Sequence, residues 1–186
     1  MRVIAGKYKG RKLYSPDNYD IRPTSDKVKE AMFSILTADI YDSSVLDLFA
    51  GTGSLGIEAL SRGARRCLFA DASRAGVKLV KSNLEHCAVE EETKVLVGDY
   101  RKVLANLSAK IGDGLEEPPG IILLDPPYNK GLLVDAIQLI SEGNILAEDG
   151  IIVAEHRKEE ELPDTIGRYH KEKDRRYGIV KLSIYK

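Results

Sequence analysis

Short apolar segments alternate with amphipathic segments after residue 45, and this alternation constrains the fold more than any other feature of the chain. Apolar segments of this length are typical of buried strands, and the helical segments between them can connect neighbouring parallel strands. The sequence therefore predicts an α/β fold with a parallel sheet covered by helices on both faces. We expect strands at 45–49, 67–71, 93–97, 121–124 and 151–154, and helices at 54–62, 73–87, 100–111 and 131–142.

The two ends of the chain depart from this alternation. Residues 169–176 and 179–185 have the character of two strands with no helix between them, so we expect an antiparallel pair at one edge of a mostly parallel, seven-stranded sheet. Residues 1–14 predict a small hairpin, and the apolar spacing from residue 28 to 36 predicts an amphipathic helix. We therefore divide the chain into an N-terminal hairpin and helix, residues 1–40, and a larger domain, residues 41–186.

Basic residues are concentrated at both ends, although the net charge of the whole chain is only −1. Residues 1–15 contain five basic and no acidic side chains, and residues 168–186 contain seven basic and two acidic ones. This distribution fits a surface that binds a polyanion, although solvated chain ends would give the same pattern. No apolar run reaches the length of a membrane span, and the two cysteines form no metal or redox motif. We expect a cytoplasmic protein without a metal site and without membrane association.

A glycine-rich segment, DLFAGTGSLG (47–56), lies between the first predicted strand and its helix. Gly51, Gly53 and Gly56 make the pattern GxGxxG, which lets a ligand approach the backbone closely at a helix N-terminus. Asp71 follows Gly51 by 20 residues and ends the next strand, where a carboxylate can accept hydrogen bonds from two ribose hydroxyls. A dinucleotide such as NAD would also satisfy all of these features, so by themselves they do not identify the ligand.

Two further acids favour a ligand without phosphate. Asp47 ends the first strand, where a carboxylate would repel a pyrophosphate but suits an ammonium group, and Asp99 ends the third, where it can accept a hydrogen bond from an adenine amine. Acids at three successive strand ends fit S-adenosylmethionine, an adenosine that carries an amino acid, although each aspartate alone could cap a helix. The predicted cofactor-binding residues are Asp47, Ala50, Gly51, Thr52, Gly53, Asp71, Ala72, Asp99 and Tyr100.

The fourth strand ends in DPPY (125–128), at the edge of the sheet where ligands bind in doubly wound folds. Asp125 and the backbone carbonyl of Pro126 can accept N–H bonds from an exocyclic amine, which would localise its lone pair and aim it at a methyl group. Tyr128 can stack on the plane of a base. We predict Asp125, Pro126 and Tyr128 as the catalytic residues. The alternative is a rigid turn with an incidental aromatic ring.

With these segments in place, residues 45–155 resemble the class I S-adenosylmethionine-dependent methyltransferases, with a Rossmann-like fold. The DPPY signature occurs in enzymes that methylate DNA adenine, protein glutamine or RNA guanine, and it does not choose among them. The segments RVIAGKYKGRKL (2–13), RPTSDKVKEAMFSIL (22–36) and RYGIVKLSIY (176–185) extend the resemblance over nearly the whole chain. They are similar to those of the bacterial small-subunit ribosomal RNA guanine-N2 methyltransferase family.

That resemblance implies a monomer that methylates the N2 amine of one guanine in 16S ribosomal RNA, within an assembled or partly assembled small subunit. A base must leave its stack to reach a buried methyl donor, and basic side chains nearby would hold RNA phosphates. The residues expected to contact RNA are Lys7, Lys9, Arg11 and Lys12 of the hairpin, with Arg22 and Thr24 before the helix, where Thr24 can also cap.

Three other functions compete with this interpretation. An adenine-N6 nucleic-acid methyltransferase would use the same cofactor and DPPY signature, but the short chain has no separate domain for reading DNA sequence. A NAD-dependent oxidoreductase would explain the glycine segment and leave DPPY without a role. A non-catalytic RNA-binding module would explain the basic ends but would not need acids at three strand ends.

Overall fold

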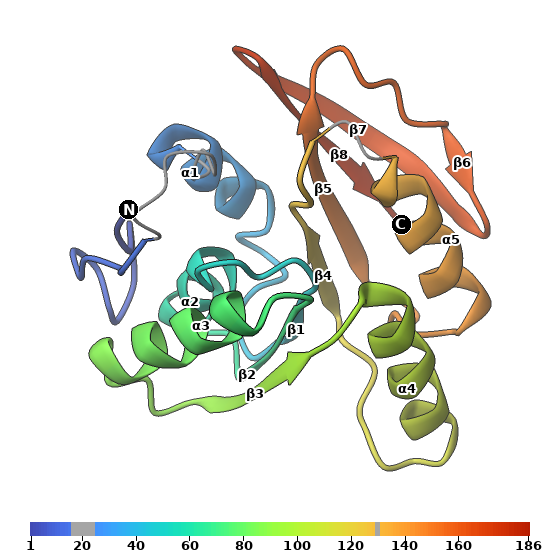
Figure 1. The fold of residues 1–186 in the computed structure, drawn as a ribbon. Helices are drawn as coiled ribbons and strands as arrows, with labels where there is room; N and C mark the ends of the chain where they lie inside the picture. The colour runs from blue at the N-terminus through green and yellow to red at the C-terminus, as the bar shows by residue number, and fades with distance from the viewer. Residues whose placement is uncertain (16–24, 129–130) are drawn as a thin grey trace.

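One eight-stranded sheet forms the centre of the computed structural model, which describes residues 1–15, 25–128 and 131–186 (Figure 1). The strand order is β3-β2-β1-β4-β5-β8-β7-β6. The first five strands pair in parallel, and the last three add antiparallel pairs at one edge. The α/β fold with a mostly parallel sheet and an antiparallel C-terminal hairpin is therefore confirmed. The parallel strands are β1 (Ser44–Asp47), β2 (Arg66–Asp71), β3 (Glu92–Val97), β4 (Ile121–Leu124) and β5 (Ile151–Arg157).

Helices cover both faces of this sheet (Figure 1), because each of β1 to β4 is followed by a crossover helix to the next parallel strand. One apolar core joins three helices to one face of the sheet, through residues such as Met32, Leu55 and Val80. A second core joins the remaining two helices to the other face, through residues such as Leu104 and Ile137. The helices of the first face are α1 (Asp26–Ile35), α2 (Ser54–Ser61) and α3 (Arg74–His86); those of the second are α4 (Tyr100–Gly112) and α5 (Leu132–Glu142).

The antiparallel edge contains one strand more than the seven-stranded sheet that we expected. β8 (Val180–Tyr185) pairs with both β5 and β7 (Tyr169–Tyr177), as an edge hairpin should. The additional strand, β6 (Thr165–Ile166), pairs with β7 at the outermost position. Its two residues are too few to show the alternation by which a strand is recognised in a sequence.

The N-terminal arm, residues 1–15, has a single antiparallel bridge between Arg2 and Lys12 in place of two regular strands. It is attached to α2 through Glu58, a fully buried carboxylate that accepts hydrogen bonds from the backbone amides of Ile4 and Ala5 at 2.8 and 3.1 Å. Lys29 of α1, also fully buried, lies 3.4 Å from Glu58 and donates to the carbonyl of Arg2 at 2.6 Å. The arm is therefore held by a buried, paired charge network rather than by a sheet.

The N-terminal cap of α1 differs from the expected one. Ser25 occupies the cap position, and its hydroxyl accepts a hydrogen bond from the amide of Val28 at 3.3 Å. The capping role that we predicted for Thr24 therefore belongs to Ser25, since either hydroxyl can serve as a cap and the helix begins one residue later. Arg22 and Thr24 themselves lie outside the described residues.

The loop that follows α4 packs against the amino ends of β2 and β3. Glu116 forms ion pairs with Arg66 of β2 and with Lys94 of β3, and Glu117 lies 2.7 Å from Arg65. These contacts neutralise basic residues at the end of the sheet opposite to the carboxyl ends of the strands. None of the helices in the described ranges is both long and apolar enough for a membrane span.

Candidate methyl-transfer site

A cavity of about 510 Å³ lies at the carboxyl ends of β1, β2 and β4. Asp47, Asp71 and Asp125 line it from these three strands, and the glycine segment and α3 supply most of the remaining wall. Since β1 lies between β2 and β4 in the sheet, three acids that are far apart in sequence meet in one site. This is the crevice in which doubly wound folds bind their ligands.

Asp47 is the most buried of these acids, with 1% of its surface exposed. Its carboxylate accepts a hydrogen bond from the amide of Gly56 at 2.9 Å. The pKa of the carboxyl is raised to about 7, mainly by burial and to a smaller extent by the negative charges of Asp125 and Asp71, while the hydrogen bond from Gly56 opposes the rise. A positively charged ligand beside Asp47 would favour its ionised form.

Asp71 fixes the glycine segment against the end of β2. One carboxylate oxygen accepts a hydrogen bond from the amide of Gly51 at 2.8 Å, and the other accepts one from Ser73 at 2.7 Å. Gly51 and Gly53 have φ values of +54° and +77°, which favour glycine and allow the tight turn before α2. A β-carbon at Gly76 would lie 2.7 Å from an Asp71 oxygen, so this glycine lets α3 approach the acid closely.

The backbone amides of all three glycines already have partners within the chain. Gly51 and Gly56 donate to Asp71 and Asp47, and Gly53 donates to the carbonyl of Ala50 at 2.7 Å. A pyrophosphate at a helix N-terminus needs such amides to be available and is repelled by carboxylates. The acids that line the site suit a cationic ligand without phosphate, which agrees with S-adenosylmethionine.

Asp99, the predicted adenine contact, and its neighbour Tyr100 do not line the cavity. The Asp99 side chain caps α4 by accepting a hydrogen bond from the amide of Arg101 at 2.9 Å, and the Tyr100 hydroxyl donates to Asp135 at 2.7 Å. Among the described residues that line the cavity, Asp99, Tyr100, Ala72 and Gly53 do not appear, whereas Asp47, Ala50, Gly51, Thr52 and Asp71 do. The cofactor-binding roles of all nine residues stay predictions.

The DPPY segment brings Asp125 to the cavity and turns Tyr128 towards β5. Asp125 is partly exposed and lines the cavity, and Pro126 after it is buried. The Tyr128 hydroxyl donates to Glu155 of β5 at 3.0 Å, and the guanidinium of Arg157 lies 5.3 Å from the centre of the Tyr128 ring. Burial, followed by the negative charges of Glu155 and Asp125, raises the pKa of the Tyr128 hydroxyl, so the hydroxyl stays protonated as a donor.

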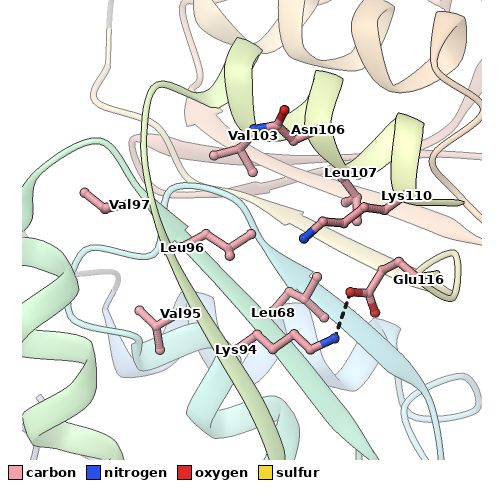
Figure 2. Close-up of a pocket in the computed structure, with 10 residues that line it drawn as sticks. All are labelled: Leu68, Lys94, Val95, Leu96, Val97, Val103, Asn106, Leu107, Lys110 and Glu116. Atoms are coloured by element: carbon pink, nitrogen blue, oxygen red, sulfur yellow. Dashed lines mark hydrogen bonds and ion pairs between the residues drawn. The ribbon is translucent and has the colours of Figure 1, made fainter.

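A second cavity, of about 240 Å³, lies between β3 and α4 and is lined by apolar side chains together with Lys94, Asn106, Lys110 and Glu116 (Figure 2). Lys94 is paired with Glu116 at 2.8 Å, at the rim of this cavity. Neither the glycine segment nor the acids at the strand ends line this second cavity, so it is not the site that the sequence predicts.

The four basic residues of the arm that were predicted to contact RNA differ in their surroundings, although all are exposed. Lys7 lies 2.9 Å from both Glu90 and Glu91, and Arg11 donates to the carbonyl of Cys87. Lys9 and Lys12 take part in none of the ion pairs found within the described part of the chain. Two of the four therefore secure the arm to the end of α3 and the turn after it.

Three residues near the site were not singled out from the sequence. Glu155 and Arg157 orient Tyr128, and Asn83 of α3 links the arm to the glycine segment. The fully buried Asn83 side chain donates to the carbonyls of Thr52 and Tyr14 at 2.8 and 3.1 Å and accepts from the Tyr14 amide at 2.7 Å. An asparagine on the apolar face of a predicted helix was the available signal, because a buried carboxamide must find partners.

The strand order, and a glycine turn with acids at the ends of the neighbouring strands, are those of a class I S-adenosylmethionine-dependent methyltransferase. Comparison with known proteins narrows this class. The chain belongs to the family described as "Conserved hypothetical protein 95", whose sequence model matches residues 1–186.

Relatives within this family are similar along their whole length. "Putative rRNA methyltransferase YlbH" of Bacillus subtilis (strain 168) is 42% identical over 186 residues, which are 100% of this chain and 98% of that protein. "Ribosomal RNA small subunit methyltransferase D" of Escherichia coli (strain K12) is 33% identical over 185 residues, 100% of this chain and 89% of that protein. The resemblance inferred from the terminal motifs is thus confirmed.

Solved structures agree with the fold. "Putative methyltransferase yhhF from Escherichia coli" superposes with a TM-score of 0.84 at 31% identity, over 100% of this chain and 96% of that one. A putative methylase, HI0767, from Haemophilus influenzae gives a TM-score of 0.75 at 32% identity, over 99% of this chain and 96% of that one.

Proposed function

We propose that this chain transfers a methyl group from S-adenosylmethionine to the exocyclic N2 amine of a guanine in small-subunit (16S) ribosomal RNA. The observation that carries the proposal is the position of Asp125. It lines the same cavity as Asp47 and Asp71, so a base held by DPPY would meet a cofactor held by the first two strands. The names of the relatives, which include ribosomal RNA methyltransferases of the small subunit, support RNA as the substrate.

The residues of the DPPY segment have different roles in the reaction. The cofactor supplies an electrophilic methyl group on a sulfonium, which needs no metal to react. Asp125 and the carbonyl of Pro126 accept N–H bonds of the guanine amine and direct its lone pair at that methyl group. The carboxylate also stabilises the positive charge that develops on nitrogen, and Tyr128 stacks on the base.

The cofactor side holds its ligand through charge and hydrogen bonds. Asp71 accepts from the ribose hydroxyls, Asp47 stabilises the cationic end of the ligand, and Asp99 with Tyr100 meets the adenine. Ala50, Gly51, Thr52, Gly53 and Ala72 supply backbone and close packing around it.

The part of the chain that reaches RNA includes residues 1–40. Lys9 and Lys12 contact phosphates, Lys7 and Arg11 hold the arm in place, and Arg22 and Thr24 approach the flipped nucleotide. The protein works as a monomer in the cytoplasm, on an assembled or partly assembled small subunit that presents the target guanine.

Identification of the methylated nucleoside tests this proposal. Purified protein and S-adenosylmethionine carrying an isotopically labelled methyl group are incubated with free 16S RNA and with small-subunit particles isolated from cells that lack the gene. We expect N2-methylguanosine at a single position, with faster transfer to the particles. N6-methyladenosine as the product would instead support the adenine-N6 enzyme, and no labelled nucleoside from either substrate would contradict RNA as the acceptor.

A further inference from the structure

Strand register places three basic residues on one face of the C-terminal edge. Directly opposite residues in antiparallel strands project to the same side of a sheet. Leu182 of β8 lies opposite both Glu155 and Arg175, so these three share a face. Its neighbours on that strand follow the same rule: Val180 lies opposite Arg157 of β5, and Ile184 lies opposite Lys173 of β7.

This face adjoins the methyl-transfer site. Leu182 and Ile184 belong to the core that includes residues of α1, so the face is the one that α1 partly covers. Arg157 ends β5 at the same edge as the DPPY segment and lies over the Tyr128 ring at 5.3 Å. The cationic row formed by Arg157, Lys173 and Arg175 therefore begins beside the predicted base-stacking residue and continues outwards along the hairpin.

The cationic row is exposed and is not neutralised within the described part of the chain. All three side chains are exposed, and no ion pair joins any of them to a described carboxylate. Lysines elsewhere on the hairpin differ: Lys171 lies 3.1 Å from Asp164, and Lys181 lies 3.1 Å from Glu161. Unpaired cations in a chain of net charge −1 provide a local attraction for an anion.

The hairpin and the N-terminal arm lie on opposite sides of the cavity. Asp125 follows β4, which lies near the middle of the sheet between β1 and β5. The arm is attached to α2 and α3 on the β1–β2–β3 side, whereas the hairpin extends the sheet beyond β5 (Figure 1). An enzyme that extracts one nucleotide from its stack must hold the strand on both sides of that nucleotide.

We propose that the cationic row of Arg157, Lys173 and Arg175 binds RNA phosphates next to the target nucleotide, on the side opposite to the N-terminal arm. This inference rests on the proposed function, since it takes the ribosomal RNA strand as the occupant. The row contributes affinity without reading sequence, because contacts to phosphate carry no base information.

The salt dependence of RNA binding tests the row. The double variant Lys173→Gln/Arg175→Gln removes two charges from this face, and Arg176→Gln/Lys186→Gln is the matched control. Arg176 lies opposite Lys181 on the other face, and Lys186 follows the end of β8 that is farthest from the site. Affinity for a 16S RNA transcript is measured by titration at several salt concentrations, and affinity for S-adenosylhomocysteine by calorimetry.

We expect the double variant to reduce the slope of log affinity against log salt by about 1.4 to 1.8, the loss of two phosphate contacts, and the control to keep the wild-type slope. Cofactor affinity should be the same in all three proteins, which shows that the substitutions leave the cofactor cavity unchanged. A wild-type slope in the double variant, or an equal loss in the control, would overturn the proposal. Methyl transfer by the wild type to the same RNA is measured in parallel. Absence of methyl transfer would contradict the proposed function. The salt slopes of the variants test RNA binding by the cationic row independently of that result.

Discussion

The two sides of the cavity are held in place differently. On the cofactor side, Asp47 and Asp71 accept hydrogen bonds from glycine amides nine and 20 residues away in the sequence. On the acceptor side, Tyr128 is oriented by Glu155 and Arg157, which belong to another strand. The cofactor side is thus assembled within one strand–turn–helix unit and its neighbour, whereas the acceptor side exists only when β4 and β5 are paired. Binding of the cofactor and positioning of the base should therefore be separable by mutation.

Replacement of Asp125 should produce the largest effect and the clearest separation. We expect Asp125→Ala to lower the rate constant of methyl transfer by about 10²–10³-fold, the usual effect of removing one pre-positioned polar group. Cofactor and RNA affinities should change far less, because the contact strengthens as charge develops on nitrogen. Single-turnover methylation of small-subunit particles measures the rate constant.

The variant Asp125→Asn serves as the matched control for charge. An amide oxygen can still accept one N–H bond, so retained activity would show that geometry dominates, and an effect equal to that of alanine would show that the negative charge is needed. Full activity in Asp125→Ala would mean that DPPY is only a turn.

Replacement of Asp71 should affect only the cofactor side of the cavity. We expect Asp71→Ala to weaken S-adenosylmethionine binding by about 1.5–3 kcal/mol, the usual loss for hydrogen bonds to a charged group. RNA affinity should stay at the wild-type value. Calorimetry with the cofactor and a separate RNA titration make the comparison, and an unchanged cofactor dissociation constant would remove Asp71 from the cofactor site.

Replacement of Tyr128 tests whether its ring or its hydroxyl matters. Tyr128→Ala should lose about 1–3 kcal/mol of base stacking, measured as weaker productive binding of RNA. Tyr128→Phe keeps the ring but loses the hydrogen bond to Glu155, so we expect a smaller loss and a less well oriented ring. Equal activity in Tyr128→Ala and the wild type would exclude stacking.

The pH dependence of cofactor binding should report Asp47. Its pKa is about 7 in the folded protein and 3.8 as the ordinary value, so the folded state holds the proton more tightly. The free energy of unfolding therefore decreases as pH rises from about 4 to about 7, because the unfolded state releases this proton first. Above pH 7 the contribution of Asp47 no longer changes with pH. A cationic ligand favours the ionised form, so we expect cofactor affinity to fall by up to about tenfold from pH 8 to pH 6. Asp47→Asn should flatten this profile, whereas an unchanged profile in that variant would assign it to another group.

Neutralisation of the arm should give the smallest effects, because exposed charges are screened at physiological salt. Lys9→Gln/Lys12→Gln should reduce the salt slope of RNA binding, since these two lysines have no ion pair in the described residues. Lys7→Gln, which removes contacts with Glu90 and Glu91, should mainly loosen the arm. Thermal unfolding and RNA titrations at several salt concentrations distinguish the two results, and an unchanged slope in the Lys9/Lys12 variant would remove the arm from the RNA path.

The sequence predicted those features that local pattern determines. The five parallel strands and the four helices between them were anticipated, because apolar runs and amphipathic spacing are local signals. The meeting of Asp47, Asp71 and Asp125 was also predictable, since the carboxyl ends of parallel strands share one edge. The two-residue β6 was missed because it is too short to carry a period, and the Ser25 cap because two adjacent hydroxyl residues compete for that position.

Long-range partners could not be predicted in the same way. Nothing near DPPY indicates that Glu155 would accept from Tyr128, because that contact depends on the pairing of β4 with β5. The pairing of Lys7 with Glu90 and Glu91 likewise depends on how the arm packs on the end of α3. Composition alone counts Lys7 as one more cation available to RNA, whereas the structure assigns its charge to two acids.

Asn83 joins the wall of the cofactor cavity to the N-terminal arm by hydrogen bonds. Its side chain bonds the carbonyl of Thr52, beside the cofactor cavity, and both backbone groups of Tyr14, at the end of the arm. Thermodynamic reciprocity requires that any factor by which RNA on the arm changes cofactor affinity is also the factor by which the cofactor changes RNA affinity. If RNA binds the arm as proposed, any movement of Thr52 between the S-adenosylmethionine and S-adenosylhomocysteine complexes would reach the RNA through Asn83, and product release would then depend on the chemical step.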